Sequence, residues 1–422
     1  MRIAVFGLGY VGSVTAACLA KMGHRVIGVD VAPAKVDLVK AGHSPVAEPG
    51  LEKLIRQAVR DRRLETTLEA SEAVAASELS LIAVGTPSRS DGGVDLNAVK
   101  AVAKQIGIGL RGRKTFHTVA LRSTVPPGTT AGVLSPILER VSGKKAGRDF
   151  GVCYHPEFLR EGTSVHDFFH PPRTVIGASQ PKAGKVLTRL WRPIRAPLLI
   201  TSLESAELLK YADNAFHALK ICYANEIASL AKSCGADGRQ VMEIFVQDTK
   251  LNISPLYFKP GFAFGGPCLP KDVRALCALG KRYRVAVPLA QAILESNESH
   301  LRRAVRRVLA TGKKRIGVVG LAFKAGTDDL RESPMVSLVR ELLLAKRIVR
   351  IYDPKVELER LWGANRKYIE RELPQIARLL ARSWEELLET SEVIVLARGG
   401  EDIPTLIHPL LKQKTVVDLT QS

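Results

Sequence analysis

One cysteine lies in a glycine-rich loop, shortly before a lysine and an aspartate. Residues 261–272 read GFAFGGPCLPKD, so that Cys268 follows two glycines and a proline. The thiolate is the nucleophilic form of cysteine, and a nearby cation such as Lys271 stabilises it. The alternative is a buried structural cysteine, which we expect for the other five: Cys18, Cys153, Cys222, Cys234 and Cys277. The loop setting of Cys268 instead predicts a nucleophile.

A second glycine-rich segment, GLGYVG, follows the first apolar run. Gly7, Gly9 and Gly12 permit a tight turn and a close approach to a pyrophosphate, which the N-terminus of the following helix would face. Asp30 closes the next apolar run, where an acid binds ribose hydroxyls and favours NAD over NADP. Lys35 is either a cation near the adenosine or a solvated surface lysine. The segment predicts an NAD site; the alternative is a glycine-rich turn without a ligand.

Three polar side chains recur on one face of a predicted helix. Lys210, Asn214 and His217 are spaced i, i+4 and i+7, which places them on the same side. Such a group can hold an oxyanion or a phosphate. It is equally well a polar stripe that faces water, and the spacing alone does not decide between these interpretations.

Two carboxylates, Glu157 and Glu161, lie four residues apart in the segment HPEFLREG. Either can act as a general base. Each can also be a surface charge, and the segment by itself favours that second interpretation.

Apolar strand-like runs alternate with helix-like segments at both ends of the chain. They lie at residues 3–6, 26–29, 79–84 and 119–121, and again at 315–321, 348–352, 393–397 and 415–418. This alternation is typical of a parallel, doubly wound sheet. We therefore predict an α/β protein with two Rossmann-like doubly wound domains joined by a long central helix.

The predicted central helix runs from residue 204 to 234, a stretch without proline or glycine. A helix of that length spans about 46 Å and is typical of a spine that joins domains or of a dimerisation element. Gly235 is a natural C-terminal stop. The expected parts are an NAD-binding domain at residues 1–200, a central helical dimerisation and active-site region at 201–300, and a C-terminal nucleotide-sugar-binding domain at 301–422.

The composition limits the class of protein. The formal net charge of +20 permits a basic nucleic-acid-binding or ligand-sensing protein, but solvated arginine-rich helix faces explain it better. No apolar run is long enough to cross a membrane, and no signal peptide precedes the first strand, so we expect a cytoplasmic protein. The cysteines lack CxxC spacing, which argues against a metal site and a disulfide framework.

Six motifs, in this order along the chain, resemble the UDP-glucose/GDP-mannose dehydrogenase family. They are GLGYVG (7–12), GTP (85–87), RSTVPPGT (122–129), PEFLRE (156–161), FGGPCLPKD (264–272) and FKAGTDDLRESP (323–334). The resemblance covers nearly the whole chain. It implies an NAD-dependent enzyme, a homodimer or higher oligomer, and a nucleotide-sugar substrate.

The resemblance also implies roles for the matching residues. Cys268 corresponds to the nucleophile, Lys210 to a lysine that stabilises an oxyanion, and Glu157 to a base that works through water. The implied catalytic residues are Cys268, Lys210, Glu157, Asp272, Asn214 and Thr124. The implied cofactor contacts are Gly7, Gly9, Gly12, Tyr10, Val11, Asp30, Lys35, Thr86, Thr124, Lys271 and Arg331. The implied substrate contacts are Glu157, Glu161, Lys210, Asn214, His217, Tyr257, Lys259, Gly265 and Lys324.

The implied reaction oxidises a sugar 6-hydroxyl to a carboxylate in two hydride transfers, through a thioester on Cys268. Four stretches resemble the GDP-mannose branch of the family, which implies GDP-mannose, and not UDP-glucose or another UDP-sugar, as the substrate and a role in supplying a uronic-acid polymer. They are KKAGRDFG (144–151), KLN (250–252), FKAG (323–326) and WGANRKYIE (362–370). Three positions depart from the usual pattern, Pro267, His155 and Lys259, and they bear on substrate affinity.

Overall fold

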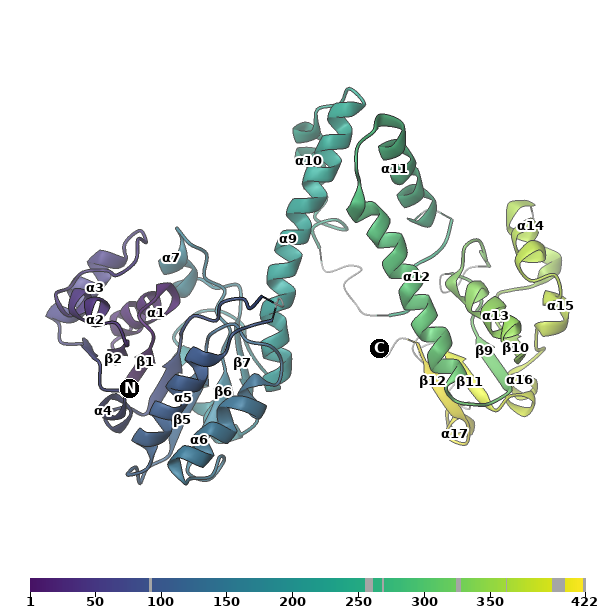
Figure 1. Ribbon diagram of the computed structural model, residues 1–422. Helices are drawn as coiled ribbons and strands as arrows, with labels where there is room; N and C mark the ends of the chain where they lie inside the picture. The colour runs from purple at the N-terminus through teal and green to yellow at the C-terminus, as the bar shows by residue number, and fades with distance from the viewer. Residues whose placement is uncertain are drawn as a thin grey trace. The chain divides into compact units, whose positions relative to one another are not determined.

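The computed structural model describes residues 1–90, 93–254, 261–267, 269–323, 328–361, 363–396 and 407–419. The chain divides into two compact units, Met1–Ala218 and Leu219–Ser422 (Figure 1). Among the described helices, none combines the length and the apolarity that crossing a bilayer requires.

A twisted sheet forms the centre of the first unit. Its strands are β1 (Arg2–Phe6), β2 (Arg25–Val29), β3 (Leu64–Thr67), β4 (Leu79–Ile82), β5 (His117–Leu121), β6 (Phe150–Tyr154), β7 (Thr174–Ala178) and β8 (Leu198–Thr201). They lie in the order β3-β2-β1-β4-β5-β6-β7-β8, and each described pair is parallel except β6 and β7. From β1 the sheet grows outward in both directions, through β2 and β3 on one side and through β4 and β5 on the other. In such sheets the usual ligand site is the crevice between β1 and β4, beyond the carboxyl ends of the strands.

Helices cover both faces of this sheet. They are α1 (Tyr10–Lys21), α2 (Pro33–Lys40), α3 (Leu51–Arg60), α4 (Ala70–Ala76), α5 (Asn97–Leu110), the π-helical turn η1 (Thr130–Leu134), α6 (Ser135–Ser142), α7 (Ser164–Phe169) and α8 (Pro181–Trp191). Ile3 and Val5 pack into a core with α1, α3 and α8, whereas Ala4 and Phe6 pack into a second core with α4, α5 and α6. Burial on both faces explains why the central strands β1 and β4 are mostly apolar.

The long central helix is present as α9 (Leu203–Ser233), 31 residues long, and appears in teal in Figure 1. It ends where predicted, because Gly235 adopts a left-handed φ of 82°. The N–H of Ala236 then donates to the carbonyl of Ala231 at 2.8 Å, which closes the helix. Cys222 lies on α9 but is exposed, so the expectation of a buried Cys222 is wrong. This stretch of helix turns that side chain away from the apolar core.

The second unit contains a smaller parallel sheet in the order β10-β9-β11-β12. Its strands are β9 (Arg315–Val319), β10 (Ile348–Tyr352), β11 (Val393–Leu396) and β12 (Thr415–Asp418). Its helical elements are α10 (Gly238–Phe245), α11 (Leu269–Tyr283), α12 (Pro288–Leu309), α13 (Pro334–Leu344), the 3-10 turn η2 (Leu358–Arg360), α14 (Gly363–Glu372), α15 (Ile376–Leu379), α16 (Trp384–Thr390) and α17 (His408–Leu411). Core residues from α12 and α13 cover one face, and those from α16 and α17 cover the other. A mostly parallel and a fully parallel α/β sheet, with a long helix between them in the chain, confirm the predicted fold class.

Candidate functional site

The turn after β1 is shaped by glycines that accept no side chain. Gly7 has a φ of 96°, and its N–H donates to the carbonyl of Val29 at 2.7 Å. A Cβ added to Gly12 would lie 1.7 Å from the carbonyl oxygen of Gly7, so only glycine fits there. Helix α1 begins at Tyr10, and Ser13 donates the first helical bond to Gly9 at 2.9 Å. The N–H groups of the first turn therefore face the crevice, as an anion site requires.

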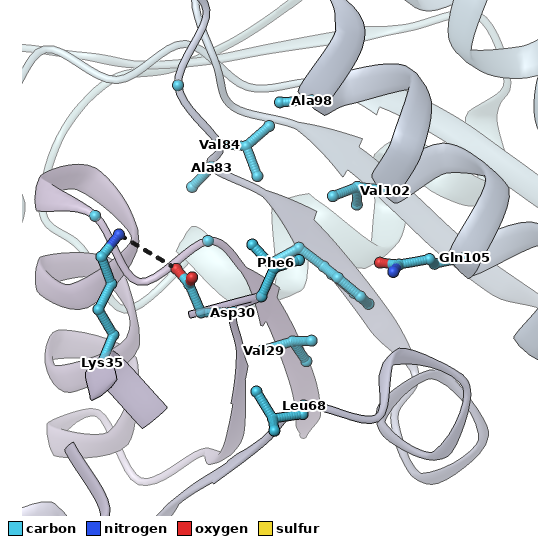
Figure 2. A pocket seen from close by; sticks show the side chains of 14 residues that line it. Phe6, Val29, Asp30, Lys35, Leu68, Ala83, Val84, Ala98, Val102 and Gln105 are labelled. Atoms are coloured by element: carbon cyan, nitrogen blue, oxygen red, sulfur yellow. Dashed lines mark ion pairs between the residues drawn. The ribbon is translucent and has the colours of Figure 1, made fainter. Parts of the chain in front are cut away.

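Asp30 stands at the end of β2, on the wall of a cavity of about 220 Å³ (Figure 2). Its carboxylate accepts the N–H of Leu8 at 2.7 Å and the N–H of Ala32 at 2.9 Å. Lys35 Nζ lies 3.6 Å from the same carboxylate, which partly neutralises it. Figure 2 shows apolar side chains such as Val84 on the opposite wall. A polar rim with an acid and apolar walls fits a ribose and a flat base.

The loops after β4 and β5 are tied to each other beside this cavity. Thr86 Oγ1 donates to the carbonyl of Thr124 at 2.8 Å, and Ser123 Oγ donates to the carbonyl of Val84 at 2.6 Å. The structure thus brings Thr86 and Thr124 together, at the carboxyl ends of neighbouring strands.

A buried ion pair lies at the end of the next strand, β6. Lys210 Nζ is 2.9 Å from Glu157 Oε1, and their side chains are 9% and 11% exposed. The N–H of Leu159 donates to the other oxygen of Glu157 at 2.7 Å, which fixes the carboxylate. The interpretation of Glu157 as a surface charge is therefore wrong, and Lys210 does not face water. A lysine held in a low-dielectric setting stabilises negative charge on a substrate oxygen more strongly than one in water.

The other polar residues predicted on this helix face and in the loop after β6 are not buried. Asn214, His217 and Glu161 are exposed in the chain as described. The stripe on α9 therefore faces inward at Lys210 and outward further along.

Arg122 lies buried behind the ion pair, with its guanidinium 5.4 Å from the ring of Trp191. Burial lowers the pKa of Arg122 to about 10, and the negative charge of Glu157 acts against that shift. Burial likewise keeps the pKa of His155 well below its ordinary value, and its Nδ1 donates to the carbonyl of Val175 at 2.7 Å. Glu157 thus faces positive charge from two sides, Lys210 and Arg122, while the departure at His155 adds a neutral ring.

Two further residues of the site were not predicted from the sequence. Glu207 is fully buried and accepts the N–H groups of Gly128 at 2.6 Å and Thr130 at 2.8 Å, which anchors the loop after β5 to α9. Its signal was available, because it lies three residues before Lys210 on the same helix face. Arg173 pairs with Asp213 at 2.5 Å and lies 4.8 Å from the ring of Phe158; its sequence context carries no such signal.

Several predicted residues lie outside the described part of the structure. They are Cys268, Tyr257, Lys259 and Lys324, together with the side chains of Lys271 and Asp272. In the second unit, a Cβ on Gly265 would lie 2.3 Å from the carbonyl oxygen of Glu332, and Arg331 pairs with Asp329 at 2.6 Å. Within the described residues, no group of three or more metal-ligating side chains is found.

The described cysteines differ in their exposure. Cys18 and Cys153 are buried as expected, and burial raises the pKa of each thiol to about 12, which makes them inert. Cys234 is exposed and Cys277 is half-buried, so the expectation of a buried Cys234 is wrong as well.

Three models of a single protein family match the chain in succession. The NAD-binding domain of the UDP-glucose/GDP-mannose dehydrogenase family matches residues 1–195, its central domain residues 204–299, and its UDP-binding domain residues 317–422. The chain belongs to the UDP-glucose/GDP-mannose dehydrogenase family. The match confirms the predicted family and the predicted cofactor, NAD.

Family members of known activity cover the whole length of the chain. The GDP-mannose 6-dehydrogenase of Pseudomonas aeruginosa is 46% identical over 99% of this chain and 96% of its own. The UDP-glucose 6-dehydrogenase of Bacillus subtilis is 36% identical over 99% of this chain and 88% of its own. The crystal structure of a ternary complex of the Pseudomonas aeruginosa GDP-mannose dehydrogenase matches with a TM-score of 0.96, covering 99% of this chain and 96% of that chain.

Proposed function

We propose that this family member oxidises the 6-hydroxyl of GDP-mannose to a carboxylate, with two NAD consumed per sugar. The observation that carries the proposal is the buried ion pair between Glu157 and Lys210, 2.9 Å apart, beyond the carboxyl end of β6 in the NAD-binding sheet. Full-length identity of 46% to GDP-mannose 6-dehydrogenases, against 36% to a UDP-glucose 6-dehydrogenase, supports the choice of sugar nucleotide. The GDP-mannuronate formed would supply a uronic-acid polymer.

The first half of the reaction converts the alcohol to an aldehyde. NAD, when bound, accepts the hydride from the sugar carbon. Glu157, acting through water, takes up the hydroxyl proton, and the Lys210 ammonium stabilises negative charge on the sugar oxygen. Arg122, buried behind Glu157, adds a second positive charge near that carboxylate.

The second half depends on Cys268. Its thiolate adds to the aldehyde carbon and forms a thiohemiacetal. The thiohemiacetal then gives up its hydroxyl proton and a hydride, for which a second NAD would be the acceptor, and becomes a thioester. Water cleaves the thioester to the carboxylic acid with release of the thiol. Asp272 holds that water and Lys210 stabilises the oxyanion, while Asn214, four residues after Lys210 on α9, assists Lys210.

The remaining assignments complete the proposal. Thr86, Thr124, Lys271 and Arg331 contact the cofactor; Glu161, His217, Tyr257, Lys259, Gly265 and Lys324 contact the sugar nucleotide. Residues 1–200 bind NAD, 201–300 form the central region, and 301–422 bind the nucleotide. The enzyme acts in the cytoplasm as a homodimer with α9 at the interface. Light scattering at micromolar concentration should therefore give at least twice 45.9 kDa, and a monomer would contradict the dimer.

Side-by-side turnover tests the substrate. Purified protein with NAD should form NADH with GDP-mannose at a kcat/KM at least about 100-fold above that with UDP-glucose, because the nucleotide pocket leaves polar groups unpaired with the wrong base. The competing candidate is a UDP-sugar dehydrogenase, which the match of residues 317–422 to a UDP-binding domain favours. A higher kcat/KM with UDP-glucose would establish that candidate and overturn GDP-mannose.

A further inference from the structure

A buried glutamate joins the cofactor turn to the loop that carries Glu157. Glu48 lies between α2 and α3, and it is 8% exposed. One of its carboxylate oxygens accepts the hydroxyl of Tyr10 and the N–H of Gly162, the latter at 2.8 Å. The other oxygen accepts the N–H of Ser164 at 2.8 Å. A single carboxylate thus binds segments more than 100 residues apart in the sequence.

The two ends of this connection belong to different binding functions. Tyr10 is the first residue of α1, in the turn whose N–H groups face a pyrophosphate. Gly162 and Ser164 close the loop that begins after β6 and carries Glu157 and Glu161. The loop can therefore shift relative to the cofactor turn only if bonds to Glu48 break.

Glu48 is held as an anion although it is buried. Burial by itself raises the pKa of Glu48, but the hydrogen bonds from Tyr10, Gly162 and Ser164 outweigh it and lower the pKa below its ordinary value. Bonds to an ionised acceptor are the stronger kind, so the connection is rigid.

Asp167, on α7 (Ser164–Phe169) directly after this loop, provides an internal comparison. It accepts the N–H of Arg160 at 3.0 Å, pairs with the Arg160 guanidinium at 2.7 Å and accepts the hydroxyl of Thr163 at 3.1 Å. None of these partners belongs to the cofactor turn. Asp167 therefore clamps the substrate side of the loop without reaching α1.

We propose that Glu48 is a positioning residue that couples the two sites, so that NAD and the sugar nucleotide each raise the affinity for the other. The inference rests on the proposed function in that the loop must contact the sugar. Whichever ligand binds first orders both the turn and the loop, and the second then binds to a loop already in place. By linkage, the effect on the two affinities is equal.

The test uses NADH and GDP-mannose, a pair that cannot react because the cofactor is already reduced. NADH fluorescence titrations with and without saturating GDP-mannose give a ratio of dissociation constants. In the wild type this ratio should be about 5 or more. In Glu48→Gln and in Tyr10→Phe, which removes one hydroxyl, it should fall to between about 1 and 2. Asp167→Asn, the matched control, should weaken GDP-mannose binding and keep the wild-type ratio.

Each outcome decides the matter. A wild-type ratio of 1, an unchanged ratio in Tyr10→Phe, or an equal loss in Asp167→Asn would overturn the coupling role. If the wild type turns over only UDP-glucose, the substrate proposal has failed, and the same titrations with UDP-glucose test the coupling independently. If Glu48→Gln fails to fold, Tyr10→Phe alone carries the test, because Tyr10 is only half-buried and the change is small.

Discussion

The turn after β1 and the turn after β9 use the same hydrogen bonds but lead to different structures. In the first, the N–H of Gly7 donates to Val29 at 2.7 Å and the N–H of Leu8 donates to Asp30 at 2.7 Å. In the second, the N–H of Gly320 donates to Tyr352 at 2.9 Å and the N–H of Leu321 donates to Asp353 at 2.7 Å. An acid after the second strand of each sheet thus holds the turn after the first.

The two turns differ in how soon a helix begins after them. Helix α1 begins three residues after Gly7, whereas α13 begins at Pro334, fourteen residues after Gly320. The first turn therefore presents a helix N-terminus directly to a pyrophosphate. The second has room for a long loop in that place. The acid is thus part of the scaffold in both units, and we propose that the tight entry into α1 is what suits the first turn to a dinucleotide.

The largest expected effect is the loss of kcat when Lys210, near the carboxyl ends of the strands of the first sheet, is replaced. Lys210→Met should lower kcat by about 100- to 1,000-fold, because the charge that meets the oxyanion is lost and Glu157 is left buried without its partner. Steady-state NADH formation measures this. Arg340→Met is the matched control, since Arg340 pairs with Glu372 on the surface of the second unit. Equal losses in the two variants would contradict the assignment of oxyanion stabilisation to Lys210.

The glycines of the two turns should differ in their effect on NAD binding. Gly12→Ala should weaken NADH binding by at least about 100-fold, because the added Cβ collides with the carbonyl of Gly7 and displaces the turn. Gly320→Ala meets no atom within 4 Å and has only its φ of 81° to disfavour it, so it should cost stability and leave NADH affinity unchanged. Fluorescence titration measures the NADH affinity of each variant. Similar affinities in the two variants would contradict the proposal that only the first turn binds the cofactor.

The two acids sharpen the comparison further. Asp30→Asn and Asp353→Asn should lower the thermal midpoint by similar amounts, since each carboxylate accepts backbone N–H groups. Only Asp30→Asn should lower the preference for NAD over NADP, by about 10-fold, because a carboxylate repels a 2′-phosphate. The measurement is kcat/KM with each cofactor. An unchanged preference in Asp30→Asn would show that another group selects the cofactor.

The smallest effect is a difference in acid stability. Burial lowers the pKa of His117 to about 3, whereas the unfolded chain binds that proton near its ordinary value of about 6.5. Stability of the first unit should therefore fall as the pH drops below about 6.5, by up to about 1.4 kcal/mol per pH unit for this histidine. The second unit contains no described histidine as deeply buried as His117; His300 there is half-buried. Hydrogen exchange at pH 7 and 5.5, compared between the units, measures this.

A matched variant isolates the histidine. His117→Asn keeps a partner for the hydroxyl of Ser80, which bonds to the ring at 2.8 Å, and removes the titrating group. Its first unit should lose less stability between pH 7 and 5.5 than the wild type does. An identical pH dependence would show that other groups cause the acid sensitivity.

Much of the fold followed from apolar alternation. The strands β3, β6, β7 and β8 were not predicted, and for β6 and β7 there is a physical reason. β6 and β7 contain Gly151 and Gly177, which interrupt the apolar runs. A Cβ at Gly151 would lie 2.5 Å from Ala183, and one at Gly177 would lie 2.8 Å from Ala206. These glycines let helices approach the sheet closely, but in the sequence they resemble breaks.

The sequence predicted the motifs of the site, but it could not predict which side chains point inward. Glu157 and Glu161 lie in a loop without periodicity, so the sequence could not tell which one faces Lys210. Lys210 and Asn214 share a helix face by spacing, but burial against the first unit includes Lys210 and excludes Asn214. No glycine-rich motif leads into a helix near Asp353, so the sequence did not single it out. Its equivalence to Asp30 shows only in the structure, where each carboxylate accepts the N–H of the leucine in its turn.

Product analysis of Cys268→Ala tests the central claim most directly. With GDP-mannose and excess NAD, the wild type should form two NADH per sugar and release the uronate. Cys268→Ala should form the acid several orders of magnitude more slowly, on the scale of about 10⁴-fold or more that removing a nucleophile commonly costs. Cys277→Ala, which changes a half-buried cysteine, should resemble the wild type. Near-normal uronate formation by Cys268→Ala, with two NADH per sugar, would contradict covalent catalysis at this residue.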